Sequence, residues 1–191
     1  MSISEQKASL REALLQKRLN VSSKKWKENS AEIVQNLKAF APFYEAKCVH
    51  SFISINERKE VNTHPLLQEL LEEGTKVIIP ITDFSTGELY HTELTSFDNL
   101  KPNKWGVLEL PSPTITSLIP DVILVPLLAA DLQLNRIGYG KGFYDRFLAT
   151  TKAIKIGLVF HEFIINEIPV EHFDQKLDIL ISEKEIISRN N

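Results

Sequence analysis

The chain has 191 residues, of which 43% are hydrophobic and 25% are charged, as is typical of a globular protein with a sizeable core. Its formal net charge of -3 argues against broad, non-specific nucleic-acid binding, which requires a net basic face. No apolar stretch approaches the roughly 20 residues that span a bilayer, and the N-terminus lacks the apolar core of a signal peptide. We therefore expect a single cytoplasmic domain over residues 1–191, with no membrane or nucleic-acid partner.

The first part of the chain has a helical pattern. Apolar residues recur at helical spacing over residues 4–40, in two runs separated by the tetrapeptide Asn20-Val21-Ser22-Ser23. Such a tetrapeptide is typical of a helix stop followed by a new N-cap. We expect a helical hairpin over residues 4–40, ended by Pro42.

After Pro42 the hydrophobic period changes to short apolar runs. These runs predict strands over residues 48–55, 76–81, 121–126, 155–160 and 177–181. Residues 63–73 predict a helix that Thr63 can cap and Gly74 ends. Strands that alternate with helices are typical of an α/β fold with a mainly parallel sheet. Residues 82–110 differ, because an alternating segment follows a turn there, and we expect a small antiparallel insertion.

The most informative segment is rich in glycine. Glycine occurs at every second position over residues 138–142, just before a predicted helix at 142–150. Backbone N–H groups in such a segment can form an anion-binding nest, and a helix N-terminus adds further donors. Arg136 and Lys141 add positive charge, and Asp145 is suited to Mg²⁺. The segment therefore predicts a phosphate site, although a tight strand-to-helix connection with surface charges is the alternative.

Motifs outside this segment sharpen the prediction. A strand ending in Pro126 precedes Asp131 and the run Arg136-Ile137-Gly138-Tyr139-Gly140-Lys141-Gly142-Phe143-Tyr144-Asp145. This arrangement resembles the signature of the 5-formyltetrahydrofolate cyclo-ligases, also called methenyltetrahydrofolate synthetases. The resemblance extends to Lys7-Ala8-Ser9-Leu10-Arg11, Glu60-Val61-Asn62-Thr63, Trp105-Gly106-Val107 and Lys176-Leu177-Asp178.

The resemblance implies an activity and a fold. The activity is the conversion of ATP and 5-formyltetrahydrofolate to 5,10-methenyltetrahydrofolate, ADP and phosphate, with Mg²⁺ as the cofactor. The implied chemistry transfers the γ-phosphoryl group to the formyl oxygen before the ring closes. The implied fold is a three-layer α/β domain with helices on both faces of the sheet. We expect a monomer whose partners are these two small molecules.

The resemblance also implies the site residues. ATP is expected to contact Lys7, Arg11, Arg136, Ile137, Gly138, Tyr139, Gly140, Lys141, Gly142, Phe143 and Tyr144, with Arg136 and Lys141 also catalytic. The folate is expected to contact Ile53, Glu60, Trp105, Gly140, Lys141, Gly142, Phe143 and Tyr144, and Mg²⁺ is expected to contact Asp145 and Asp178. Tyr139 occupies a variable place in the signature and is assigned no specific contact of its own.

Several of these assignments have alternatives. Lys7 and Arg11 share one helix face, and their spacing by itself favours a solvated surface over a binding site. Glu57 competes with Glu60 for the pterin, because a charged loop lies between the strand and Glu60. Trp105 is also consistent with core packing.

For Asp178, a location at a strand end is the alternative to a metal ligand. Other function classes are a ligase or kinase that acts on another small anion, and a catalytically silent binding protein. The presence of Arg136, Lys141, Asp145 and Asp178 together argues against a binding protein without catalytic activity.

Overall fold

A twisted, mainly parallel sheet forms the centre of the fold. The computed structural model describes residues 1–103 and 106–189, and within them seven strands pair in the order β12-β11-β9-β6-β1-β2-β3. The five inner strands are parallel, and the two edge strands β12 and β3 are antiparallel to their neighbours. The strands are β1 (Cys48–His50), β2 (Lys76–Asp83), β3 (Glu88–Leu94), β6 (Val122–Val125), β9 (Ile154–Leu158), β11 (Ile179–Ile181) and β12 (Ile186–Ser188).

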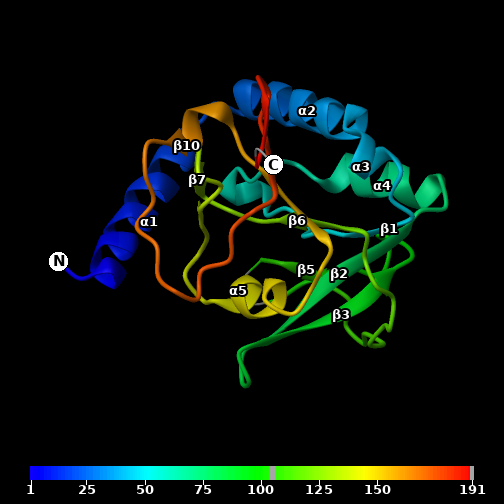
Figure 1. Ribbon diagram of the computed structural model, residues 1–191. Coiled ribbons are helices and arrows are strands. Elements are labelled where there is room, and N and C mark those ends of the chain that lie inside the picture. Colours follow the sequence, from blue (N-terminus) through cyan, green and yellow to red (C-terminus); the bar gives the residue numbers. More distant parts are fainter. Residues whose placement is uncertain (104–105, 190–191) are drawn as a thin grey trace.

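Helices cover both faces of this sheet, which confirms the predicted three-layer α/β class. Figure 1 shows α2 (Ser23–Ala39), α3 (Ala41–Tyr44) and α4 (His64–Glu72) on one side and α5 (Phe143–Leu148) on the other. The two helices predicted at 4–40 are α1 (Ile3–Leu19) and α2, and α1 runs at an angle away from α2. Two short 3₁₀ helices, η1 (Asn56–Arg58) and η2 (His161–Phe163), lie in loops. None of the helices in the described part of the chain is both long and apolar enough to cross a membrane.

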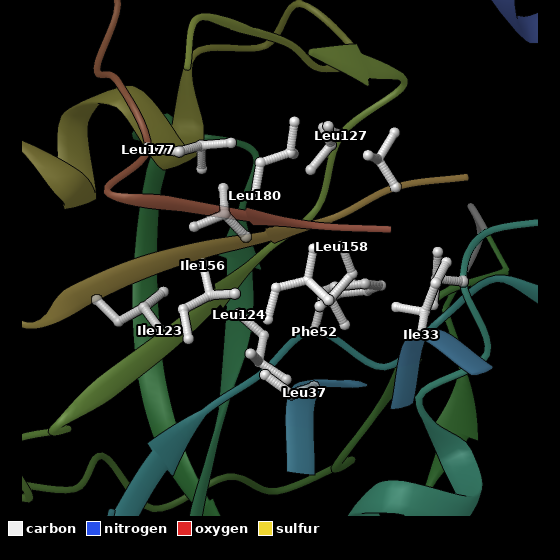
Figure 2. Close-up of a cluster of buried hydrophobic side chains, with 14 of the residues drawn as sticks. Ile33, Leu37, Phe52, Ile123, Leu124, Leu127, Ile156, Leu158, Leu177 and Leu180 are labelled. Carbon is white, nitrogen blue, oxygen red and sulfur yellow. The ribbon is translucent and has the colours of Figure 1, made fainter. Parts of the chain in front are cut away.

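The core joins the sheet to the helices on its faces. Figure 2 shows Ile33 and Leu37 of α2 close to side chains from the sheet, and both are fully buried. On β9, Gly157 allows close packing, because a Cβ there would lie 2.5 Å from Cδ1 of Leu177. These contacts fix the sheet beneath the loops that leave the carboxyl ends of its strands.

The strand predicted at 48–55 is shorter than expected, because β1 ends at His50. The side chain of Thr63 takes over the hydrogen bonds of the following residues. Its Oγ1 donates to the carbonyl of Phe52 at 3.0 Å and accepts from the N–H of Ser54 at 3.1 Å. Thr63 precedes α4 but makes no side-chain capping bond, so its hydroxyl shapes a buried loop and does not cap the helix.

The segment predicted as an antiparallel insertion extends the sheet. β2 and β3 pair in register from Val77 opposite Leu94 to Asp83 opposite Glu88. Beyond them, the short strands β4 (Lys101–Pro102) and β5 (Leu108–Glu109) pair antiparallel. A third sheet, which the hydrophobic pattern did not predict, has the order β10-β7-β8, from Ile164–Ile165, Ala129–Asp131 and Arg136–Ile137.

Candidate active site

A cavity of about 360 Å³ lies at the carboxyl ends of the parallel strands. Phe52 and Ile53 follow β1 and line it, as does Pro126, which follows β6. This is the edge at which ligands bind in open α/β sheets. Of the residues expected from the sequence, the cavity wall contains Lys7, Arg11, Ile53, Glu60 and the whole run from Arg136 to Asp145. Trp105 lies outside the described residues.

Residues 136–145, which we call the glycine loop, start from a rigid turn. The carboxylate of Asp131 accepts hydrogen bonds from the N–H groups of Gln133, Asn135 and Ile168, at 2.9–3.1 Å. These bonds hold the β7–β8 turn, and β8 then presents Arg136 to the cavity. The sequence signature included Asp131, and its contacts show a structural contribution to the loop.

Two cations of the site have different surroundings. Arg136 is buried, and its Nη2 donates to Oδ1 of Asp145 at 2.7 Å. Burial lowers the pKa of Arg136, while Asp145 and Asp174 oppose that shift, so its guanidinium stays charged. Within the described residues, its buried Nε has no hydrogen-bond partner. Lys141, in contrast, is exposed at the tip of the glycine loop.

The first helix contributes two further cations. Lys7 is only 3% exposed, and its Nζ lies 2.9 Å from Oε2 of Glu171 and 2.5 Å from Oδ2 of Asp174. Arg11 contacts the glycine loop, because its Nε donates to the carbonyl of Gly138 at 3.1 Å. A purely solvated helix face is therefore excluded for this pair.

The structure separates Asp178 from the cavity. Asp178 precedes β11, at the amino end of the parallel strands, whereas the cavity lies at their carboxyl ends. Its Oδ2 accepts from the backbone N–H of Lys155 at 2.9 Å and lies 3.3 Å from Nζ of the same residue. The expected contact of Asp178 with Mg²⁺ in this site is therefore corrected: Asp178 occupies the strand end that was its alternative.

Asp174 was missed from the sequence. It lines the cavity together with Asp145. The available signal was a short acidic cluster, Glu171 and Asp174, in the loop before β11. Among the described residues no three or more His, Cys, Asp or Glu side chains gather as a complete metal site.

Glu60 and Glu57 differ in position. Glu60 is 5% exposed and lines the cavity, whereas Glu57 is exposed on η1. One oxygen of Glu60 accepts from the N–H of Ile55 at 2.7 Å and the other accepts from the hydroxyl of Tyr139 at 2.5 Å. The geometry thus favours Glu60 as the carboxylate that a ligand in the cavity would meet.

One wall of the cavity is apolar. It is formed by Phe52, Ile53, Ile55, Ile79, Phe84, Leu89, Val107 and Leu108. Several of these belong to β2, β3 and β5, so the antiparallel insertion builds part of the site. From this insertion, the sequence resemblance assigned only Trp105 to the folate. Phe84 contacts Phe143 of α5 edge to face, with 5.7 Å between ring centroids. An apolar wall of this kind is typical of pockets that bind small molecules.

Comparisons with known proteins find relatives in sequence and in fold. A profile of the 5-formyltetrahydrofolate cyclo-ligase family matches residues 3–183. The Caenorhabditis elegans protein named "Probable 5-formyltetrahydrofolate cyclo-ligase" is 31% identical over 202 residues, which cover 97% of each chain. The NMR structure of Aquifex aeolicus 5,10-methenyltetrahydrofolate synthetase has a TM-score of 0.84 and 30% identity, covering 97% of this chain and 94% of that one. A synthetase structure from Mycoplasma pneumoniae has a TM-score of 0.71 at 22% identity, covers 93% and 98%, and supports the fold alone.

Proposed function

Because the chain belongs to the 5-formyltetrahydrofolate cyclo-ligase family, we propose that it converts 5-formyltetrahydrofolate and ATP to 5,10-methenyltetrahydrofolate, ADP and phosphate. The observation that carries this proposal is that one cavity contains two unlike parts. One part is the glycine loop with Arg136 and Lys141, which suits a polyphosphate. The other is the apolar wall with Glu60 at its side, which suits a flat heterocycle with polar edges.

The chemistry we propose has two steps. The formyl oxygen of the folate attacks the γ-phosphorus of ATP, and the bond to ADP breaks. N10 of the folate then attacks the activated formyl carbon and loses its proton, and inorganic phosphate leaves with the former formyl oxygen. The protein mainly aligns the reactants and offsets negative charge, as is general in phosphoryl transfer.

Arg136 and Lys141 have complementary roles in this scheme. Arg136 is buried and oriented by Asp145, so it is a fixed donor for phosphate oxygens. Lys141 is exposed on a loop with positive φ at Gly140 and Gly142, so its ammonium group can follow the transferring phosphoryl group. The fixed cation and the mobile cation together offset negative charge on the phosphoryl group before and after its transfer.

The carboxylates at the cavity fit Mg²⁺. In nucleotide sites Mg²⁺ is commonly held by one or two carboxylates together with phosphate oxygens. Asp145 and Asp174 both line the cavity, and their ion pairs with Arg136 and Lys7 use only one oxygen of each. We assign these two residues to the ion, which would offset phosphate charge when it binds with ATP.

We assign the folate pterin to Glu60. A buried carboxylate can accept two adjacent donors of the pterin amide and amino groups. Ile53 would line the same pocket, next to the segments that position Glu60. We further propose that the enzyme acts as a cytoplasmic monomer. Light scattering and cell fractionation test these two assignments.

A turnover assay tests the proposed function. Purified protein is mixed with Mg²⁺, ATP and 5-formyltetrahydrofolate, while the absorbance of methenyltetrahydrofolate and the release of ADP are followed together. We expect both to grow in equal amounts and to stop when ATP is omitted. Folded protein that forms no methenyl product would refute the proposal. Release of ADP without the methenyl product would instead favour a kinase, and binding without turnover a silent protein.

A further inference from the structure

Tyr139 connects the two parts of the cavity. It stands between Gly138 and Gly140 in the glycine loop, yet its hydroxyl donates to Oε1 of Glu60, 79 positions earlier, at 2.5 Å. The hydroxyl belongs to the segment assigned to ATP, and its acceptor belongs to the pocket assigned to the pterin.

Two arginines hold the Tyr139 side chain in place. Cζ of Arg18 lies 5.6 Å and Cζ of Arg58 lies 5.2 Å from the centroid of its ring. Arg18 also donates from Nη2 to the Tyr139 hydroxyl at 2.5 Å. Arg18 is itself buried, and it is held there because it donates to the carbonyls of Arg58 and Leu127 at 2.9 and 3.0 Å. The hydroxyl therefore accepts from Arg18 and has its proton free for Glu60.

The protonation of Tyr139 suits this role. Burial and the neighbouring Glu60 raise the pKa of Tyr139, while Arg18 lowers it by less. The phenol therefore remains a donor at neutral pH. The second oxygen of Glu60 is held by the N–H of Ile55 at 2.7 Å. Nη2 of Arg18 lies 4.0 Å from the oxygen that Tyr139 contacts, so Tyr139 is one of three groups that set the direction of this carboxylate.

We propose that Tyr139 is a positioning residue that couples the nucleotide site to the folate site. A nucleotide that orders the glycine loop places the Tyr139 hydroxyl, and the hydroxyl in turn orients Glu60 for the pterin. Coupling of this kind is reciprocal, so the folate tightens nucleotide binding by the same factor. The inference rests on the proposed function, because only there is Glu60 assigned to the pterin.

Calorimetry on Tyr139→Phe tests the coupling. Phenylalanine keeps the ring that both arginines contact and removes only the hydroxyl. Binding of 5-formyltetrahydrofolate is measured with and without Mg²⁺ and a non-hydrolysable ATP analogue. In the wild type we expect the analogue to tighten folate binding by about tenfold, within the usual range of site-to-site coupling. In Tyr139→Phe this factor falls toward one, and it is calculated against the affinity of the variant for each ligand alone.

A matched variant and a double variant complete the test. Tyr44→Phe makes the same chemical change at a residue that is 80% exposed on α3, and it should keep the wild-type factor. Adding Glu60→Gln to Tyr139→Phe should weaken folate binding by less than the product of the two single effects, because the two residues act through one bond.

The outcomes separate the inference from the proposed function. A wild-type coupling factor in Tyr139→Phe overturns the inference, and so does a wild type that turns over but shows no coupling. A wild type that neither binds nor converts 5-formyltetrahydrofolate overturns the proposed function. If Tyr139→Phe does not fold, Arg18→Lys removes the planar donor to the hydroxyl and must lower the same factor. An unchanged factor in that variant also overturns the inference.

Discussion

The ammonium group of Lys7 lies 2.5 Å from Oδ2 of Asp174, a residue 167 positions further along the chain. This ion pair ties the first helix to the loop before β11, and it places Asp174 in the wall of the cavity. Asp178, four positions later, points instead to Lys155 at the opposite end of the sheet. Substitutions of Asp174 and Asp178 can therefore be compared directly for their effect on Mg²⁺ binding.

Asp174→Asn should raise the Mg²⁺ concentration that gives half of the maximal rate. Loss of one charged ligand should weaken the affinity for Mg²⁺ by about tenfold. The matched change Asp178→Asn should leave that concentration unchanged, because its carboxylate lies outside the cavity. The measurement is the turnover rate as a function of free Mg²⁺ at saturating ATP. Equal shifts in the two variants would contradict the assignment of Asp174.

Lys141→Ala should lower kcat by about 10²- to 10³-fold, the usual cost of losing a charged group at the reacting centre. Its free energy of unfolding should stay close to that of the wild type, because the Lys141 side chain is exposed. Lys152→Ala, an exposed lysine beyond α5, is the control. Steady-state kinetics and urea unfolding give the two quantities. A wild-type rate in Lys141→Ala would remove this residue from the mechanism.

Glu60→Gln and Glu57→Gln should separate the two candidate pterin ligands. The buried Glu60 loses its charge-assisted acceptors, so the KM for the folate should rise by about tenfold. The KM for ATP should change much less. Glu57 is exposed on η1, and its variant should resemble the wild type. A larger folate effect in Glu57→Gln would reverse the assignment.

Gly140→Ala should weaken ATP binding through a steric contact. Gly140 has a φ of +84°, and a Cβ there would lie 2.8 Å from Cζ of Arg11. Gly74→Ala is a matched control, because Gly74 has a φ of +79° with open space around it. Both variants should lose about 1 kcal/mol of stability from backbone strain. Only Gly140→Ala should also lose nucleotide affinity in calorimetry, and equal affinities would argue against the contact with Arg11.

The stability of the fold should fall in mild acid. Nε2 of His50 lies 3.1 Å from Nδ1 of His91 beneath α5. Burial lowers the pKa of both rings, and for His50 the neighbouring His91 lowers it further. A depressed folded pKa means that the unfolded chain takes up the proton first. Stability is therefore complete above pH 6.5 and falls below it, by at most about 1.4 kcal/mol per pH unit for each histidine.

Urea unfolding between pH 7.5 and 5.5 measures this loss. His91→Gln should show a shallower decline than the wild type, since one of the two titrating rings is gone. His172→Gln, at an exposed position, should follow the wild type. An equal decline in His91→Gln would mean that other groups cause the acid sensitivity.

Local patterns along the chain were sufficient for the fold class and for the glycine loop. The spacing of apolar residues that indicates a helix or a strand is set within a short segment of the chain. It could therefore be recognised from the sequence, and it predicted the α/β fold and the antiparallel segment. The spacing of Arg136, Lys141 and Asp145 in one short run likewise predicted a phosphate site, and the structure places all three in one cavity. The strand predicted at 48–55 was too long, because the distant Thr63 takes its hydrogen bonds.

Contacts between distant segments were decided only by the tertiary structure. The sequence alone left Lys7 open between a surface and a site, and it assigned Asp178 where the cavity contains Asp174. The bond from Tyr139 to Glu60 was likewise beyond a local pattern. The physical reason is that a parallel sheet sends its two strand ends to opposite edges. Whether an acidic residue near a strand meets the ligand therefore depends on which edge the folded chain brings it to.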